Sequence, residues 1–188
     1  MGAYTTRVIT REEYVEIIQT LRKGFLNVRP NNKVATALVV EANLGIRISD
    51  VLNFTLNNVI KLGQKEILDM TEGKTKKDRN FTILQPTINY IRQYCLDNNI
   101  KSNEKIFDIT PRQVQNVLKM AVDYLGYKKV STHSFRKFFS TELYRLSGHD
   151  LKLVQVVLQH EDIKTTQRYL GVSQEEIEKA LEQLNALV

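Results

Sequence analysis

The sequence contains few of the residues that build covalent cross-links or metal sites. Its 188 residues include one cysteine, three histidines and three prolines. A single cysteine excludes an internal disulfide and fits a reducing cytoplasm. Cys95 lies in an apolar helical pattern with Ile88 and Ile91, which indicates core packing. No zinc-ligand spacing and no HExxH motif occur, so we expect no metal and no other cofactor.

Long apolar runs are missing as well. No stretch approaches the ~20 apolar residues that span a bilayer, and the N-terminus lacks a signal-peptide core, so we expect a cytoplasmic protein without a membrane partner. The chain is 42% hydrophobic and 26% charged, which fits one ordinary globular domain. Its formal net charge of +6 favours a polyanionic partner.

A nucleotide-binding loop is also absent. Gly73-Lys74-Thr75 resembles the end of a P-loop, but the position five residues before Gly73 is Leu68, where that motif requires a glycine. We therefore expect no nucleoside triphosphate cofactor.

Most of the sequence carries helical patterns with clear start signals. Thr10–Glu13 and Thr110–Gln113 have the form of capping boxes, and Gly45 is suited to end a helix. Ser49 is expected to cap a short helix, which leaves Arg47 in the turn before it. Five helices are expected to begin at Thr10, Asn32, Asp50, Pro86 and Thr110. Three more are expected to span about 134–146, 151–158 and 162–168.

One region reads as strands instead of helix. Residues 66–70 and 80–84 mix apolar and polar residues and flank a polar, lysine-rich turn at 71–78, with Val59–Ile60 as a third strand. The predicted fold is therefore mainly α (α+β): a helical domain with one small three-stranded antiparallel sheet.

A last capping box, Ser173–Glu176, predicts a C-terminal helix over 174–188. Its apolar residues fall on one stripe: Ile177, Leu181, Leu184 and Val188. Two interpretations stay open, packing within the chain or docking on a neighbouring molecule.

Two arginines and a histidine are candidates for phosphate chemistry. A guanidinium donates two parallel hydrogen bonds and keeps its charge, so it suits phosphate oxygens. Arg47 lies in a glycine-containing turn, and His133 and Arg136 are spaced to share one helix face. Each of these residues alone is more often structural than functional.

Tyr169 and the hairpin lysines complete the candidates. A phenol needs nearby cations or a base to act as a nucleophile, and Tyr169 falls at a helix end close to His160. Lys74 and Lys76 lie on a turn able to reach into a groove, although such lysines are usually only solvated.

Together these segments resemble the tyrosine recombinase (phage integrase) family over essentially the whole chain. The segments are LGIRISDV (44–51), EGKTKKDR (72–79), THSFR (132–136) and LQHEDIKTTQRY (158–169). The resemblance implies a catalytic set that attacks a DNA phosphodiester without ATP or metal: Arg47, Lys74, His133, Arg136, His160 and Tyr169.

The resemblance also implies a role for each residue. Tyr169 would form a 3′-phosphotyrosyl link, and Arg47 and Arg136 would hold the non-bridging oxygens. His133 would assist proton transfer, and His160 would hydrogen-bond the phosphate. Lys74 would protonate the departing 5′-oxygen, with Lys76 as a weaker alternative.

The family usually carries a helical core-binding domain before the catalytic one, and this domain is expected to be absent here. Residues 1–188 then form one catalytic domain, from a fragment or a naturally short recombinase of bacterial, phage or mobile-element origin. Double-stranded DNA is the expected partner, with a tetramer on synapsed DNA and a monomer when free. The alternatives are a type IB topoisomerase and a non-catalytic DNA-binding module.

Overall fold

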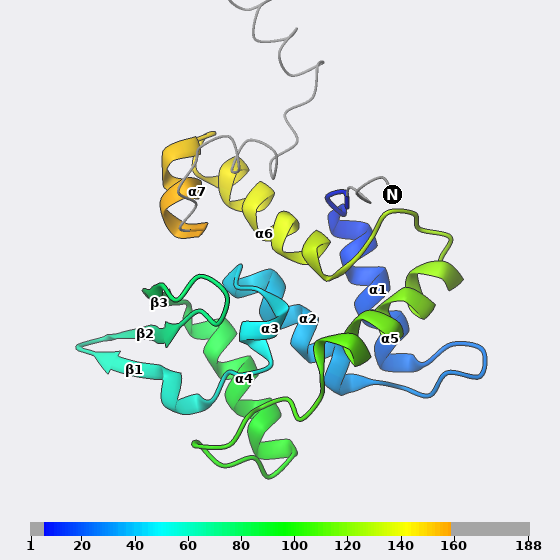
Figure 1. Ribbon diagram of the computed structural model, residues 1–188, viewed down its shortest axis with the longest axis horizontal. Helices are drawn as coiled ribbons and strands as arrows, with labels where there is room; N and C mark the ends of the chain where they lie inside the picture. Colours follow the sequence, from blue (N-terminus) through cyan, green and yellow to red (C-terminus); the bar gives the residue numbers. More distant parts are fainter. Residues whose placement is uncertain (1–5, 159–188) are drawn as a thin grey trace, which may run out of the picture. The chain divides into compact units, whose positions relative to one another are not determined.

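The computed structural model of this chain describes residues 6–158 (Figure 1). The chain divides into two compact units, Met1–Phe139 and Ser140–Val188. The helices among the described residues are α1 (Arg11–Lys23), α2 (Asn32–Leu44), α3 (Ile48–Val51), the 3₁₀ helix η1 (Leu56–Asn58), α4 (Gln85–Asp97), α5 (Pro111–Tyr124), α6 (Thr132–Leu146) and α7 (Leu151–Leu158). The strands are β1 (Val59–Leu62), β2 (Lys65–Thr71) and β3 (Asp78–Ile83).

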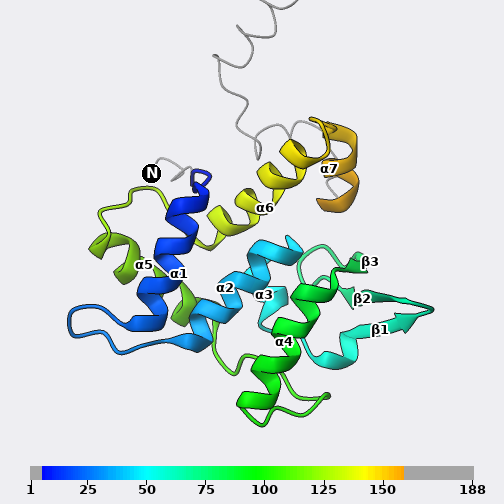
Figure 2. The ribbon, with the colours of Figure 1, turned by 180° about the vertical axis from the view of Figure 1, so that it is seen from behind.

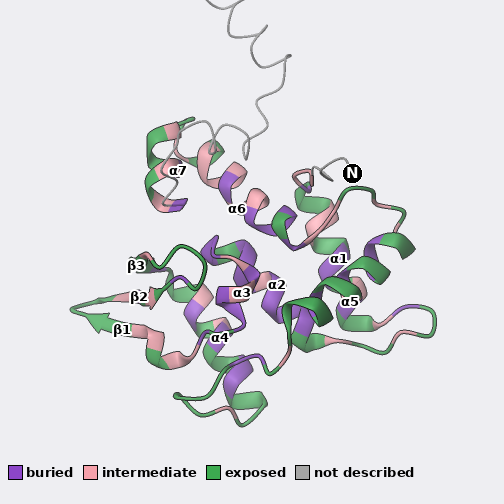
Figure 3. Ribbon diagram, in the orientation of Figure 1, coloured by how far each residue is buried: buried purple, intermediate pink, exposed green. Residues whose placement is uncertain are grey.

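Helix α2 is the centre of the first unit. It packs against α1, α3, α4 and α5, and most of its residues are buried (Figure 3). Asn31 caps its first turn by accepting a hydrogen bond from the Val34 amide at 3.0 Å. Gly45 ends it in the left-handed conformation, with φ 61°. The predicted helix over 32–44 is thus confirmed, and its end fixes where the chain turns towards Arg47.

The capping boxes are confirmed at both predicted helix starts in the first unit. The Thr10 side chain and Glu13 satisfy each other's backbone amides at the start of α1, and Thr110 and Gln113 do so at the start of α5. Seen from behind, in Figure 2, α1 runs beside α5, in agreement with the packing between these two helices.

Two predicted helix starts differ from the structure. Helix α3 begins at Ile48, because the Arg47 carbonyl already accepts from the Asp50 and Val51 amides, so Arg47 is the N-cap residue and Ser49 lies inside the helix. Pro86 is the second residue of α4, not the first, because Gln85 already has helical geometry.

The small sheet is three-stranded and antiparallel, as predicted, and its strand order is β1-β2-β3. Leu68 is paired with Val59 on one side and Phe81 on the other. Leu68 and Ile83 are buried, whereas β1 is largely exposed. Only one face of the sheet therefore joins the core, as expected for an antiparallel sheet with one solvated side. The β2–β3 turn, residues 72–77, lies on the side of the sheet that faces α3 (Figure 1).

In the second unit, Asp150 caps α7 by accepting from the Leu153 amide at 2.9 Å. His149 lies between α6 and α7 and has a positive φ of 70°. The predicted helices at 162–168 and 174–188 lie outside the described residues. Among the helices of residues 6–158, none is both long enough and apolar enough to cross a membrane.

Gly45 gives a direct test of this packing. A Cβ atom at Gly45 would lie 2.3 Å from Cδ1 of Phe139, in addition to the strain of a positive φ. Gly126 has φ 75° but no atom within 4 Å of such a Cβ, so Gly126→Ala is a control for backbone strain alone. We expect Gly126→Ala to lower the free energy of unfolding by about 1 kcal/mol, and Gly45→Ala to lower it by about 1–3 kcal/mol more through overpacking. Urea unfolding measures both variants, and equal losses would contradict the packing.

Candidate active site

Arg47 is placed by the sharp turn between α2 and α3. Gly45 reverses the chain, Ile46 is buried, and Arg47 follows in extended conformation as the N-cap of α3. Its side chain keeps 21% of its surface exposed. Because the backbone on both sides is held in helices, the guanidinium is presented from a rigid base.

Arg136 and His133 come from the first turns of α6. The Ser131 amide donates to the Ser134 hydroxyl at 3.2 Å, which fixes the start of this helix. Arg136 is buried, with 1% of its side chain exposed, whereas His133 is exposed. Burying a guanidinium without a counter-ion is costly, so the surroundings of Arg136 must supply a negative group.

That group is Glu72, at the end of strand β2. Its Oε2 accepts a hydrogen bond from Nη1 of Arg47, and its Oε1 lies 3.9 Å from Nη1 of Arg136. The Thr75 hydroxyl also donates to Oε2 at 2.6 Å. Two guanidinium groups from distant parts of the sequence therefore share one buried carboxylate. We call Arg47, Glu72 and Arg136 the arginine–carboxylate cluster.

The β2–β3 turn is tied to the same place by backbone contacts. The Gly73 amide donates to Oδ1 of Asp50 in α3 at 3.0 Å, and Asp50 is buried. The turn closes on itself, since the Glu72 amide donates to the Lys77 carbonyl at 2.9 Å and the Lys76 amide to the Glu72 carbonyl at 3.0 Å. This arrangement carries the exposed Lys74 beside α3 and the cluster.

The electrostatics of His133 show which cations surround it. Partial removal from water lowers the pKa of His133, and the positive charges of Arg136, Arg47 and Lys74 lower it further. Lys137 adds a smaller effect in the same direction. A lowered pKa keeps the imidazole neutral at pH 7 and able to accept a proton. Lys76 is not among the groups that act on His133.

Glu41 is a second carboxyl group near Arg136. It lies in α2 and is fully buried. Burial raises the pKa of Glu41 well above its usual range, although the charge of Arg136 and the Ile48 backbone oppose this.

Four of the six predicted residues are thus gathered in one place: Arg47, Lys74, His133 and Arg136. His160 and Tyr169 lie outside the described residues. Asp50, where a short helix was predicted to begin, lies inside α3 and accepts a hydrogen bond from the Gly73 amide.

Sequence reasoning missed the role of Glu72. The only sign in the sequence was an acidic residue at the start of an otherwise lysine-rich turn. It missed Glu41 as well, which looks like an ordinary polar residue in an apolar helix.

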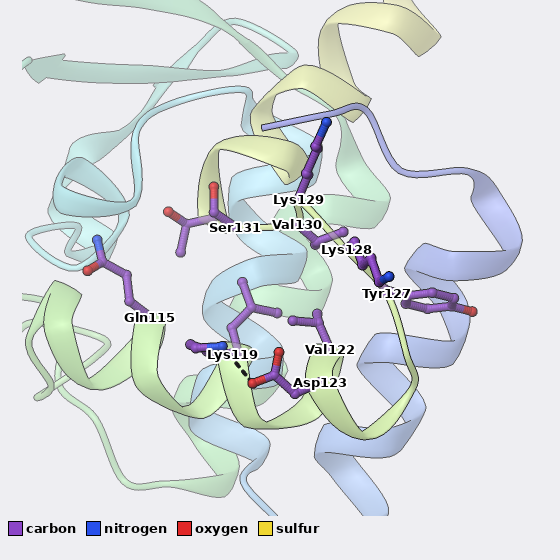
Figure 4. Close-up of a pocket in the computed structure, with 11 residues that line it drawn as sticks. Gln115, Lys119, Val122, Asp123, Tyr127, Lys128, Lys129, Val130 and Ser131 are labelled. Atoms are coloured by element: carbon purple, nitrogen blue, oxygen red, sulfur yellow. Dashed lines mark hydrogen bonds and ion pairs between the residues drawn. The ribbon is translucent and has the colours of Figure 1, made fainter. Parts of the chain in front are cut away.

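A separate hollow of about 710 Å³ lies between α5 and the segment 127–132. Figure 4 shows Lys119, paired with Asp123, and Lys128 at this hollow, while Val122 and Val130 give it an apolar wall. The arginines of the cluster do not line it.

Known proteins of one family are similar to this chain. The model of the phage integrase family matches residues 7–176, a range that includes the positions of His160 and Tyr169. The chain is 30% identical over 168 residues to the probable integrase/recombinase YoeC of Bacillus subtilis, covering 86% of this chain and 88% of that protein. It is 27% identical over 192 residues to tyrosine recombinase XerA of Pyrococcus furiosus, covering 95% of this chain and 62% of that protein. The chain therefore belongs to the phage integrase family, the tyrosine recombinases.

Solved structures show the same fold. The crystal structure of XerA recombinase matches with a TM-score of 0.67 at 19% identity, over 97% of this chain and 65% of that one. A pre-cleavage complex of XerH recombinase with its difH substrate also matches with a TM-score of 0.67 at 19% identity, over 93% of this chain and 53% of that one. The predicted fold class is confirmed. The chain spans less than two thirds of XerA from Pyrococcus furiosus and 45% of a XerC from Leptospira interrogans.

The charge environment of His133 predicts its titration. We expect its pKa in the free protein to lie below the ordinary value of 6.5, so that it gains its proton only as the pH falls below 6.5. NMR titration of the three histidines measures this, with His133→Asn to assign the signal. Lys74→Ala should move the midpoint upward, and Lys76→Ala should leave it in place. A midpoint at or above 6.5 in the wild type would contradict the arrangement.

Proposed function

We propose that this chain catalyses site-specific DNA recombination, with Tyr169 as the nucleophile that attacks the scissile phosphate. The observation that carries the proposal is the cluster, in which guanidinium groups from α3 and α6 converge on a single carboxylate beside His133 and Lys74. A carboxylate held by two arginines marks a site where a phosphate is also well bound.

The arginines stabilise the transition state. When a phenolic oxygen adds to phosphorus, charge grows on the non-bridging oxygens, and preplaced donors bind that state more tightly than the substrate. Arg47 and Arg136 fit this role because each is fixed by a helix start and neither loses its proton.

The remaining groups move protons. Tyr169 loses its proton, its oxygen forms a bond to phosphorus, and the bond from phosphorus to the 5′-oxygen breaks. His133, neutral at pH 7, assists removal of the tyrosine proton, and Lys74 donates a proton to the 5′-oxygen. His160 hydrogen-bonds the phosphate. The 3′-phosphotyrosyl bond conserves the energy of the phosphodiester, so attack by a 5′-hydroxyl of a second DNA reverses the step.

Double-stranded DNA is the partner in this proposal, in line with the net charge of +6 and with the DNA-bound XerH complex that shares the fold. Strand exchange needs four active sites on synapsed DNA, and we propose a tetramer there and a monomer in the absence of DNA. Residues 174–188 would dock on a neighbouring protomer. One catalytic domain over 1–188 accounts for this chemistry.

The covalent step is tested by trapping on nicked duplexes taken from the DNA around the gene that encodes the chain. We expect the wild type to form a covalent protein–DNA complex under denaturing conditions and Tyr169→Phe to form none. Transfer of the trapped strand to a second duplex distinguishes a recombinase from a topoisomerase. No adduct with any duplex would favour a DNA-binding module.

Lys74 is tested against Lys76 in the same assay. Because Lys74 acts on His133 and Lys76 does not, we expect Lys74→Ala to slow single-turnover cleavage by roughly 10²–10⁴-fold. Lys76→Ala should change the rate by only a few-fold. In a substrate with sulfur in place of the 5′-bridging oxygen, the leaving group departs without a proton, so this substrate should restore the cleavage rate of Lys74→Ala. Failure of that substrate to do so would exclude Lys74 as the general acid.

A further inference from the structure

We propose that Glu72 is a positioning residue whose carboxylate occupies, in the DNA-free protein, the place that the scissile phosphate takes between Arg47 and Arg136. The inference deepens the proposed function and rests on it for the identity of the phosphate. It concerns the state of the site before DNA arrives.

The carboxylate lies between the two arginines: it accepts a hydrogen bond from Nη1 of Arg47 and lies at an ion-pair distance of 3.9 Å from Nη1 of Arg136. Its two oxygens face two different guanidinium groups, Oε2 towards Arg47 and Oε1 towards Arg136. Non-bridging phosphate oxygens held by an arginine pair are divided in the same way. Glu72 also neutralises two like charges that would otherwise repel each other inside the protein.

Burial shows that carboxylate and phosphate exclude each other. Glu72 exposes 2% of its side chain and Arg136 exposes 1%, so an incoming phosphate cannot contact Arg136 while this arrangement persists. A phosphate would also meet the negative charge of Glu72 at close range, where repulsion is weakly screened. Binding of the phosphate therefore requires the carboxylate to move.

Movement of Glu72 reaches Lys74 through the short turn. Glu72 begins residues 72–77, and its backbone closes that turn through Lys76 and Lys77. The Thr75 hydroxyl holds the carboxylate from inside the same turn. Displacing the carboxylate thus loosens the segment that carries Lys74. The same event opens the arginine pair and frees the general acid to reach the 5′-oxygen.

The test is the affinity of the full chain for inorganic sulfate at low ionic strength, with NMR of His133 and of the arginine side chains as the readout. Glu72→Gln keeps the shape of the side chain but removes the competing charge, so we expect its dissociation constant for sulfate to fall at least tenfold below that of the wild type. Arg47→Ala added to Glu72→Gln should abolish the gain.

Glu66→Gln is the matched control. Glu66 lies on the same strand and pairs with Arg92 of α4 at 2.7 Å, with 12% of its side chain exposed, so its substitution removes the same charge from a different arginine. It should bind sulfate like the wild type. Sulfate affinity in Glu72→Gln that is equal to or weaker than that of the wild type would overturn the proposal.

A loss of stability in Glu72→Gln does not block the test. The buried arginines then lack the Glu72 counter-ion, and we expect sulfate to raise the melting temperature of this variant more than that of Glu66→Gln.

If Glu72→Gln does not fold even with sulfate, the variant Thr75→Val provides the test, because it removes the hydroxyl that donates to Oε2 of Glu72. We expect Thr75→Val to bind sulfate more tightly than the wild type, and an unchanged affinity would overturn the proposal. Sulfate binding needs neither Tyr169 nor DNA, so failure of the cleavage proposal would leave this result intact.

Discussion

The site depends on two guanidinium groups that share one buried carboxylate. Arg47 and Arg136 are far apart in the sequence, and like charges do not gather in a protein interior unless an anion compensates them. Glu72 supplies that anion from the end of β2. Its position requires the hairpin to lie against α3, which the Asp50–Gly73 hydrogen bond secures. Helix α2, packed at the centre of the first unit, sets the turn from which Arg47 projects.

This constraint explains why the small sheet belongs to a mostly helical domain. Among the sheet residues whose burial the structure describes, only Leu68 and Ile83 are buried in the core, so the strands add little apolar burial compared with the helices. The sheet instead carries a turn that places one carboxylate on the arginines and one lysine near His133. Partial burial and the surrounding positive charges both lower the pKa of that histidine. The same cations that favour a phosphate therefore also prepare a proton acceptor.

Local signals made most of the fold predictable, and long-range electrostatics made part of the site unpredictable. Capping at Thr10 and Thr110 and the left-handed end at Gly45 are properties of a few adjacent residues, so the sequence alone locates them. The predicted start of α3 was wrong. Ser49 has the side chain of a typical N-cap residue, but the Arg47 carbonyl already accepts the first backbone hydrogen bonds of the helix. Arg47, Lys74, His133 and Arg136 were predicted as a set through the resemblance to the tyrosine recombinase family. Glu72 and Glu41 were missed because each interacts with an arginine that is distant in the sequence.

The central claim is that Arg47 and Arg136 act on one phosphate as a unit. A double-mutant cycle on single-turnover cleavage measures this most directly, with Arg47→Lys, Arg136→Lys and the double variant. Each single variant should lose on the order of 10²-fold in rate, as expected for one lost charge-stabilising donor. If the two arginines form one clamp, the double variant should lose far less than the product of the single losses. Fully multiplicative losses would show that the arginines act independently and would contradict the account.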